Sequence, residues 1–228
     1  MEPNSLIVAE NPLSVPTRSL EDATLVVIML IIFAVASTLP VVTNSTFVLI
    51  PLKSFTEAKF RLAEVMTEEE RVDLAKKMAQ IVVEAAKPLP VAIVCDDEEV
   101  ASWAREKGAE IIWVDNPGLN TAVETGVNAL ASQGVGKIII AHGDLPKAIQ
   151  LSHCADFDGI TLVPDRHKDG TPVLVIPTNL NFEFSYGPGS YARHVSAAER
   201  SGFPWRSMID VNLNHDVDEP EDLEGLNF

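Results

Sequence analysis

The chain has 228 residues, which is enough for one sizeable α/β domain with a buried core and short for two. Its 33 acidic and 17 basic residues give a formal charge of -16, which argues against broad electrostatic binding to nucleic acid or to an anionic membrane surface. The two cysteines have no spacing typical of a metal clip or a disulfide framework, so a reducing, cytoplasmic environment is expected.

The amino-terminal part, residues 1–45, is an extension with a long apolar stretch. No charged residue occurs between Asp22 and Lys53, and residues 23–42 are long enough to span a membrane, which would leave the basic residues that follow on the cytoplasmic side. A secretory signal peptide does not fit, because one cation precedes the stretch against four acids. The alternatives to a span are a buried accessory helix or upstream sequence joined by a wrongly chosen start codon.

Residues 46–228 alternate between short apolar runs and amphipathic segments, which predicts one domain. Strands are expected over residues 47–51, 91–94, 110–114, 137–141, 160–163, 173–176 and 209–211. Helices are expected over residues 67–87, 97–107, 120–131 and 190–200, and the first of them opens with a capping box at Thr67. This alternation predicts an α/β fold with a mostly parallel central sheet flanked by helices.

The loop after the first strand carries three cations within nine positions, Lys53, Lys59 and Arg61. Ligands bind at the carboxyl ends of strands in open α/β sheets, and cations placed there can neutralise a triphosphate and a departing pyrophosphate. The alternative is a solvated loop whose cations offset neighbouring glutamates. We favour the phosphate clamp because the loop lies at the carboxyl end of a buried strand, where ligands bind.

Two acidic clusters lie about seventy residues apart. Asp144 follows the apolar strand at 137–141, and Asp216 and Asp218 precede a second acidic run. Carboxylates at the ends of strands can hold a hard divalent cation such as Mg²⁺ against phosphate oxygens. Each cluster taken alone is also good chemistry for starting a helix, which is the simpler alternative.

Two further loops carry candidate ligand contacts. Asn120 stands where a helix is expected to begin, so its carboxamide either caps that helix or reads a base edge. Thr171 follows a turn, while Gly187 and Ser190 lead into a helix with Arg193 one turn inside it. Glycines let the backbone approach an anion, and helix-start N–H groups favour one, so this part suits a phosphate or a carboxylate.

Six short motifs resemble, in the same order, the guanylyltransferases of coenzyme F-420 biosynthesis. The motifs are residues 49–53, 58–62, 119–121, 143–146, 187–190 with 192–194, and 216–220, and the resemblance covers residues 47–226. It implies a Rossmann-like nucleotidyltransferase fold of the nucleotide-diphospho-sugar transferase type. It also implies transfer of GMP from GTP to phosphoenolpyruvate or 2-phospho-L-lactate, with release of pyrophosphate.

The resemblance also implies roles for individual residues. The family's metal positions fall on Asp144, Asp216 and Asp218, and its acceptor-contacting positions fall on Thr171, Gly187 and Ser190. The apolar extension is not part of the family pattern, and Pro172 after the acceptor-contacting threonine raises a question about the local backbone.

The expected chemistry agrees with the residue types. A phosphate monoester is already a nucleophile at neutral pH, so its attack on the α-phosphorus of GTP needs alignment and charge neutralisation rather than a general base. Mg²⁺ and the cationic loop would supply that neutralisation. Two alternatives stand beside this function: another nucleotidyltransferase of the fold, acting on molybdopterin or a sugar phosphate, and a non-catalytic, membrane-tethered nucleotide-binding module. The sequence leaves open the acceptor acid and the oligomeric state.

Overall fold

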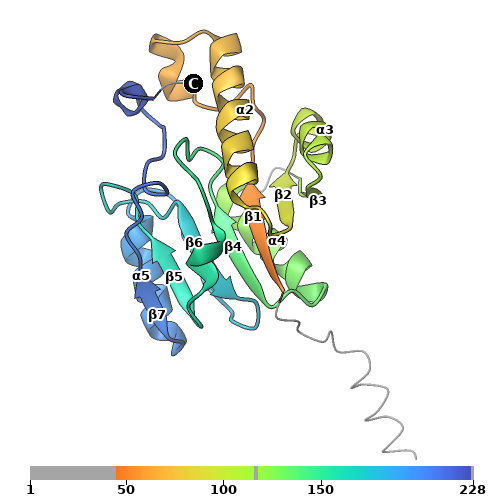
Figure 1. Ribbon diagram of the computed structural model, residues 1–228, viewed down its shortest axis with the longest axis vertical. Coiled ribbons are helices and arrows are strands. Elements are labelled where there is room, and N and C mark those ends of the chain that lie inside the picture. The colour runs from red at the N-terminus through yellow and green to blue at the C-terminus, as the bar shows by residue number, and fades with distance from the viewer. Residues whose placement is uncertain (1–44, 116–117, 227–228) are drawn as a thin grey trace, which may run out of the picture. The chain divides into compact units, whose positions relative to one another are not determined.

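The computed structural model describes residues 45–115 and 118–226, which form a seven-stranded sheet with helices on both faces (Figure 1). The strands are β1 (Thr46–Pro51), β2 (Val91–Cys95), β3 (Glu110–Trp113), β4 (Lys137–Ala141), β5 (Ile160–Val163), β6 (Val173–Pro177) and β7 (Trp205–Ser207). Their order is β3-β2-β1-β4-β6-β5-β7, and β6 runs antiparallel to both of its neighbours while the others are parallel. The prediction of a mostly parallel sheet is confirmed.

The helices lie close to their predicted positions. The α-helices are α2 (Glu68–Ala85), α3 (Glu98–Glu106), α4 (Gly118–Ser132) and α5 (Ser190–Ser201), and the short 3-10 helices are η1 (Phe60–Glu64), η2 (Ser152–Ala155) and η3 (Pro220–Leu223). The capping box of α2 is present, because Thr67 Oγ1 accepts from Glu70 N at 3.3 Å and Glu70 Oε2 accepts from Thr67 N at 2.8 Å.

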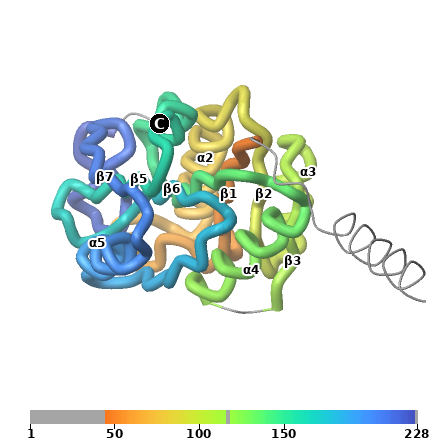
Figure 2. Tube along the Cα trace, turned by 90° about the horizontal axis from the view of Figure 1, so that it is seen from below, coloured from red at the N-terminus to blue at the C-terminus, as the bar shows by residue number. Residues whose placement is uncertain are grey.

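Successive strand residues enter two hydrophobic cores, one on each face of the sheet. On β1, Val48 and Ile50 belong to one core and Leu49 to the other, as the two-residue repeat of a strand requires. Residues of α2 and α3 complete the first core, and residues of α4 and α5 complete the second. Figure 2 shows α2 on one side of the strands and α4 and α5 on the other. Since both faces are covered, the carboxyl ends of the parallel strands remain as the place for a ligand.

One predicted strand is wrong. Residues 209–211 form no strand, and the last strand is instead β7, which pairs with β5 through Ile160 and Trp205. Ile209 and Val211 are 69% and 71% exposed, so their alternating apolar pattern is not buried against anything in the described domain. Apolar residues at two alternate positions, Ile209 and Val211, were therefore not sufficient to indicate a strand of the sheet.

The predicted extension of residues 1–45, with its candidate span at 23–42, lies outside the described residues except for Ser45. Over residues 45–115 and 118–226, no helix is both long and apolar enough to cross a membrane. The described domain starts with a backbone anchor, because Ser45 O accepts hydrogen bonds from Gly136 N at 3.1 Å and from Lys137 N at 3.2 Å.

We expect a chain that begins at Thr43 to fold with the stability of the full chain. Ser45 and β1 would both be retained, and every candidate site residue lies downstream, so the free energy of unfolding should change by no more than about 0.5 kcal/mol. Urea unfolding followed by circular dichroism measures this. A shortened chain that does not fold would show that the preceding residues pack into the domain. Carbonate-resistant pelleting of the full chain, absent from the shortened one, would identify a membrane anchor.

Candidate active site

Two adjoining pockets lie at the carboxyl ends of β1 and β4. The first pocket has a volume of about 340 Å³ and is bounded by the loop after β1, including Lys53 and Lys59. The second pocket has a volume of about 380 Å³ and includes Thr171 and Ser190 in its walls. Leu119, His142 and Asp144 line both pockets. The two spaces are therefore contiguous, and the Asp144 carboxylate lies where they meet.

Lys59 joins two of the three predicted metal-binding aspartates. Its Nζ lies 2.5 Å from Asp144 Oδ2 and 3.1 Å from Asp218 Oδ1. Burial alone would lower the pKa of Lys59, but the charges of the two carboxylates raise it above its usual value. Burial likewise opposes ionisation of Asp144, yet the ammonium of Lys59 lowers the pKa of that carboxyl. Lys59 and Asp144 are therefore both charged at neutral pH.

The backbone of Lys59 is unusual, with φ 57° and ψ 35° in the left-handed region. A residue with a long side chain pays roughly 1–2 kcal/mol for this conformation. Lys59 is the residue directly before η1, where the chain turns. Its ammonium group contacts Asp144, which follows β4. Such strain is found most often at functional sites, and here it places a cation in the cleft.

Three buried polar atoms without a hydrogen-bond partner belong to residues that line the second pocket. They are His142 Nε2, Asp144 Oδ1 and Tyr186 Oη, and among the described residues only Arg71 Nε shares this property. Buried polar groups are nearly always hydrogen-bonded, so a cluster of unpartnered ones calls for a missing partner. The concentration of these atoms around one pocket indicates a ligand site.

The second pocket is strongly acidic. Five carboxylates line it, those of Asp144, Asp165, Asp169, Asp216 and Asp218. Burial, followed by the negative charges of Asp144 and Asp218, raises the pKa of Asp216 to about 7. Arg61 is the single Lys or Arg residue among the described residues that line this pocket, and it forms an ion pair with Glu219 at 3.0 Å.

These residues fit a divalent cation. Carboxylate oxygens are the ligands that Mg²⁺ prefers, and Asp144 Oδ1 is a buried oxygen that lacks a partner. In the part of the chain that the structure describes, no three His, Cys, Asp or Glu side chains are already grouped closely enough to hold a metal. The Lys59 ammonium instead takes the position of the positive charge between Asp144 and Asp218.

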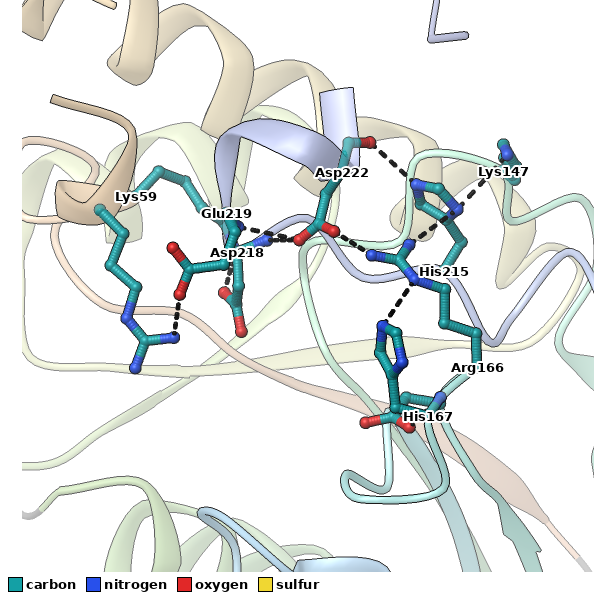
Figure 3. A network of polar contacts seen from close by, with 10 residues as sticks. Lys59, Lys147, Arg166, His167, His215, Asp218, Glu219 and Asp222 are labelled. Atoms are coloured by element: carbon teal, nitrogen blue, oxygen red, sulfur yellow. Dashed lines mark hydrogen bonds and ion pairs between the residues drawn. The ribbon is translucent and has the colours of Figure 1, made fainter. Parts of the chain in front are cut away.

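A polar network holds the segment that carries Asp216 and Asp218 (Figure 3). Asp222 Oδ2 accepts hydrogen bonds from Asp218 N at 2.7 Å and from Glu219 N at 2.8 Å, and its other carboxylate oxygen forms an ion pair with Arg166. His215 Nε2 contacts the Asp222 carbonyl oxygen at 3.0 Å, and Arg166 contacts His215 Nδ1 at 3.1 Å. The network ties the carboxyl-terminal segment to the turn after β5.

Arg166 and Asp222 were not predicted from the sequence as part of the site. A signal was present for Asp222, because the run from Glu219 to Asp222 forms a capping box with proline at the start of η3. No local pattern marked Arg166, since its partner is 56 positions away.

The N–H groups of Gly189, Ser190 and Tyr191 at the start of α5 are not free, contrary to the expectation from the sequence. Gly189, at φ 72°, donates its N–H to both carboxylate oxygens of Asp169 at 3.0 Å. Ser190 N donates to Gly187 O and Tyr191 N donates to Asp169 O, both at 2.9 Å. The carboxylate of Asp169 thus occupies the start of this helix, and Ser190 lines the second pocket.

Arg193 is not brought to the second pocket. Its guanidinium donates to Ser185 Oγ and to Pro188 O at 2.7 Å, and to Ser185 O at 2.9 Å. It lines a separate surface pocket together with Glu183 and Arg200. Arg193 therefore holds the loop from outside, whereas Thr171, Gly187 and Ser190, the acceptor positions that the resemblance implies, lie together in the walls of the second pocket.

His194, the residue after Arg193, is fully buried and bonded through both ring nitrogens. Its Nε2 accepts the N–H of Ser185 at 3.0 Å, and its Nδ1 lies 3.0 Å from Thr171 Oγ1. Burial, followed by the charges of Arg193 and His142, lowers the pKa of His194 to about 4. The ring is therefore neutral at pH 7. His194 lies in the motif at residues 192–194, but the sequence indicated no role for it.

Asn120 does not cap the helix that carries it. It is the third residue of α4, which begins at Gly118, and its side chain grips the backbone of Tyr186. Asn120 Oδ1 accepts from Tyr186 N at 2.6 Å, and Asn120 Nδ2 donates to Tyr186 O at 3.5 Å. Both ends of the carboxamide are thus used to fix the segment that carries Tyr186 into the second pocket.

The chain matches the family model described as "Guanylyl transferase CofC like" over residues 46–227. A relative named phosphoenolpyruvate guanylyltransferase, from Sphaerobacter thermophilus, is 30% identical over 191 residues, which cover 80% of this chain and 92% of the relative. Another of the same name, from Rubrobacter xylanophilus, is 32% identical and covers 80% and 93%. The 2-phospho-L-lactate guanylyltransferase of Methanocaldococcus fervens is 27% identical and covers 77% and 82%.

Solved structures share the fold at low sequence identity. A protein from Desulfovibrio desulfuricans assigned to the nucleotide-diphospho-sugar transferases superposes with a TM-score of 0.63 at 13% identity, covering 79% of this chain and 85% of the other. A nucleotidyl transferase from Methanothermobacter thermautotroptrophicus gives 0.56 at 13% identity, with 79% and 94% covered. The predicted nucleotidyltransferase fold is confirmed.

Proposed function

Since the chain belongs to the guanylyl transferase CofC-like family, we propose that it transfers GMP from GTP to phosphoenolpyruvate or 2-phospho-L-lactate, with release of pyrophosphate, in coenzyme F-420 biosynthesis. Besides the family membership, the position of Asp144 between the two pockets supports this proposal. Asp144 lies where a pocket with two lysines meets an acidic pocket that also includes Thr171 and Ser190, so a triphosphate and a small acid can meet at this carboxylate.

The first pocket is the proposed site of the nucleotide. Lys53 is exposed at its wall and Lys59 is kept charged by Asp144 and Asp218, so both side chains can stabilise the negative charge that develops on pyrophosphate. In the reaction, a phosphate oxygen of the acceptor bonds to the α-phosphorus of GTP, and the bond from that phosphorus to the β-phosphate oxygen breaks. No proton has to be removed from the acceptor, because a phosphate monoester is largely ionised at neutral pH.

The second pocket is the proposed site of the acceptor. The second pocket is large enough for a three-carbon acid, and Thr171, Gly187 and Ser190 line it, so the hydroxyl groups of Thr171 and Ser190 are the proposed contacts of that acid. The five carboxylates would repel such an anion unless a further cation were present. We therefore propose that Asp144, Asp216 and Asp218 hold Mg²⁺. When bound, the ion would offset the charge of the phosphate groups and orient them.

Purified protein incubated with GTP, MgCl₂ and each acid in turn should release pyrophosphate and form the corresponding guanylyl product, identified by mass spectrometry. Phosphoenolpyruvate, 2-phospho-L-lactate, a sugar 1-phosphate and molybdopterin are the compounds to compare. Turnover confined to the last two would replace the proposed acceptor with another. Binding of GTP without product from any compound would indicate a non-catalytic binding module.

Ser190→Ala should raise the KM for the acceptor acid by about tenfold and leave the KM for GTP nearly unchanged, because a hydrogen bond to an anion would be lost. Ser196→Ala is the matched control on the same helix, since its hydroxyl is exposed and bonds only to Ala192 O within the described residues. Steady-state kinetics with each substrate varied in turn measures both constants. An increase in the GTP constant alone would place the nucleotide, rather than the acid, beside Ser190.

A further inference from the structure

We propose that His194 is a positioning residue that fixes the Thr171 hydroxyl as a hydrogen-bond donor to the acceptor acid. This inference rests on the proposed function, because it takes the second pocket as the acceptor site. It concerns a residue that lies behind the pocket wall and touches no ligand itself.

The position of the proton on the ring follows from its neighbours. The Ser185 N–H donates to His194 Nε2 at 3.0 Å, so this nitrogen must carry a lone pair rather than a proton. In a neutral imidazole the proton then resides on Nδ1, and Nδ1 lies 3.0 Å from Thr171 Oγ1. His194 is therefore the donor and the threonine oxygen the acceptor in this contact.

The threonine proton must point elsewhere as a consequence. Thr171 Oγ1 receives a hydrogen from His194, so its own O–H cannot be directed at the ring. Among the described residues this hydroxyl has no second hydrogen-bond partner, and Thr171 is part of the second pocket's wall. Phosphate and carboxylate groups accept hydrogen bonds, so a hydroxyl held as a donor suits the proposed acceptor.

The surroundings of the ring keep it in this orientation. His194 is fully buried, with the Tyr186 ring edge-on at 4.8 Å and the Phe182 ring at 5.8 Å. Turning the imidazole over would replace both bonded nitrogens with carbons and leave the Ser185 N–H and the Thr171 hydroxyl without partners. Protonating it would set an N–H at Nε2 against the N–H of Ser185, which agrees with the lowered pKa of His194.

Arg193 gives this arrangement a second support. Its guanidinium holds Ser185 through both Oγ and the carbonyl oxygen, and the N–H of the same serine bonds to His194. Consecutive residues of α5 thus grip one serine from two sides. The order of contacts runs from Arg193 to Ser185, then to His194, and then to Thr171 at the pocket.

Two substitutions of His194 test the roles of its two ring nitrogens separately. His194→Asn keeps an amide N–H near the place of Nδ1, and His194→Gln keeps a carbonyl oxygen near the place of Nε2. We expect His194→Gln to raise the KM for the acceptor acid about three- to tenfold, with the KM for GTP within about twofold of the wild type. His194→Asn should stay close to the wild-type acceptor KM. Equal acceptor constants for His194→Gln and the wild type would overturn the proposal.

A double-mutant cycle tests whether His194 acts through Thr171. Thr171→Val should raise the acceptor KM about tenfold or more, and adding His194→Gln to it should cause no further increase, because the hydroxyl to be positioned is gone. Thr171→Ser, which keeps the hydroxyl, is the control. Effects that multiply in the double variant would show that His194 acts by some other route and would overturn the proposal.

Nitrogen NMR of the wild-type protein gives a readout that needs no activity and no variant. The His194 Nδ1 resonance should be that of a protonated nitrogen and the Nε2 resonance that of an unprotonated one. A protonated Nε2 would overturn the proposal even if the enzyme is active. Wild-type protein that transfers GMP to none of the acids would instead contradict the proposed function, while the ring nitrogens would still report the hydrogen bonds.

Discussion

Asp144→Asn should lower the turnover number for pyrophosphate release at least about a hundredfold while the protein remains folded. The carboxylate lies at the junction of the two pockets, has a buried oxygen without a partner, and holds the Lys59 ammonium at 2.5 Å. The amide is nearly the same size but carries no charge, so it can neither bind a divalent cation strongly nor pair with the lysine. Initial rates with saturating GTP, acid and Mg²⁺ measure the effect.

The other two aspartates and a surface aspartate complete this test. Asp216→Asn and Asp218→Asn should give losses of similar size if the three carboxylates act together on one ion. Asp158→Asn is the matched control, because Asp158 is exposed and lines neither pocket. Turnover near the wild-type rate in all three site variants would contradict the proposed metal site. A normal circular dichroism spectrum is required of each variant.

The sheet could be predicted from the sequence because burial on both faces leaves a simple pattern. The apolar runs that became β1 and β4 are continuous, as expected for parallel strands covered by helices on each side. The strand expected at 209–211 is not formed. Apolar residues at alternate positions, here Ile209 and Val211, do not show whether a neighbouring strand is available for pairing. At the far edge of the sheet, β5 pairs with residues 205–207 instead of 209–211. Which segment pairs with a strand depends on the whole fold, so it cannot be read from a short stretch of sequence.

Site residues at the ends of strands and in loops could be predicted from the sequence. Site residues on a helix were harder to predict, because the sequence does not show which side chains of the helix face the pocket. Arg193 and His194 are neighbours in sequence, but successive residues of a helix point about 100° apart. The arginine therefore faces outward to the loop, and the histidine points inward to Thr171. The charge of Arg193 made it the expected ligand contact. The orientation of α5 instead directs the neutral His194 toward Thr171 in the pocket wall.

Asn120 and the loop before α5 failed for a related reason. Their polar groups were expected to bind a ligand or cap a helix, but each is engaged by a distant part of the chain. The Asn120 carboxamide is held by Tyr186, which is 66 positions away, and the Gly189 N–H is held by Asp169, which is 20 positions away. Sequence spacing reveals which groups are able to bind an anion, but it does not reveal which of them the fold has already satisfied.

Lys59→Met should destabilise the protein by about 3 kcal/mol at neutral pH in the absence of divalent cations. The substitution leaves the Asp144 carboxylate, whose side chain is 20% exposed, without its ammonium partner, and removing one member of a buried ion pair costs more than the pair itself contributes. Lys76→Met is the matched control. It breaks an ion pair with Glu99 in which the side chains are 33% and 51% exposed, so a loss below about 1 kcal/mol is expected.

Mg²⁺ should restore much of the stability that Lys59→Met loses. In the wild type, a divalent cation and the lysine ammonium compete for the same carboxylates, whereas in the variant the ion meets no competitor. An ion that binds only the folded state stabilises it by about 2.7 kcal/mol at a hundred times its dissociation constant. Urea unfolding with and without MgCl₂ therefore should show a larger gain for Lys59→Met than for the wild type or Lys76→Met. Equal gains in all three proteins would mean that Asp144 and Asp218 do not bind the ion, and the Lys59 ammonium would then be their permanent partner.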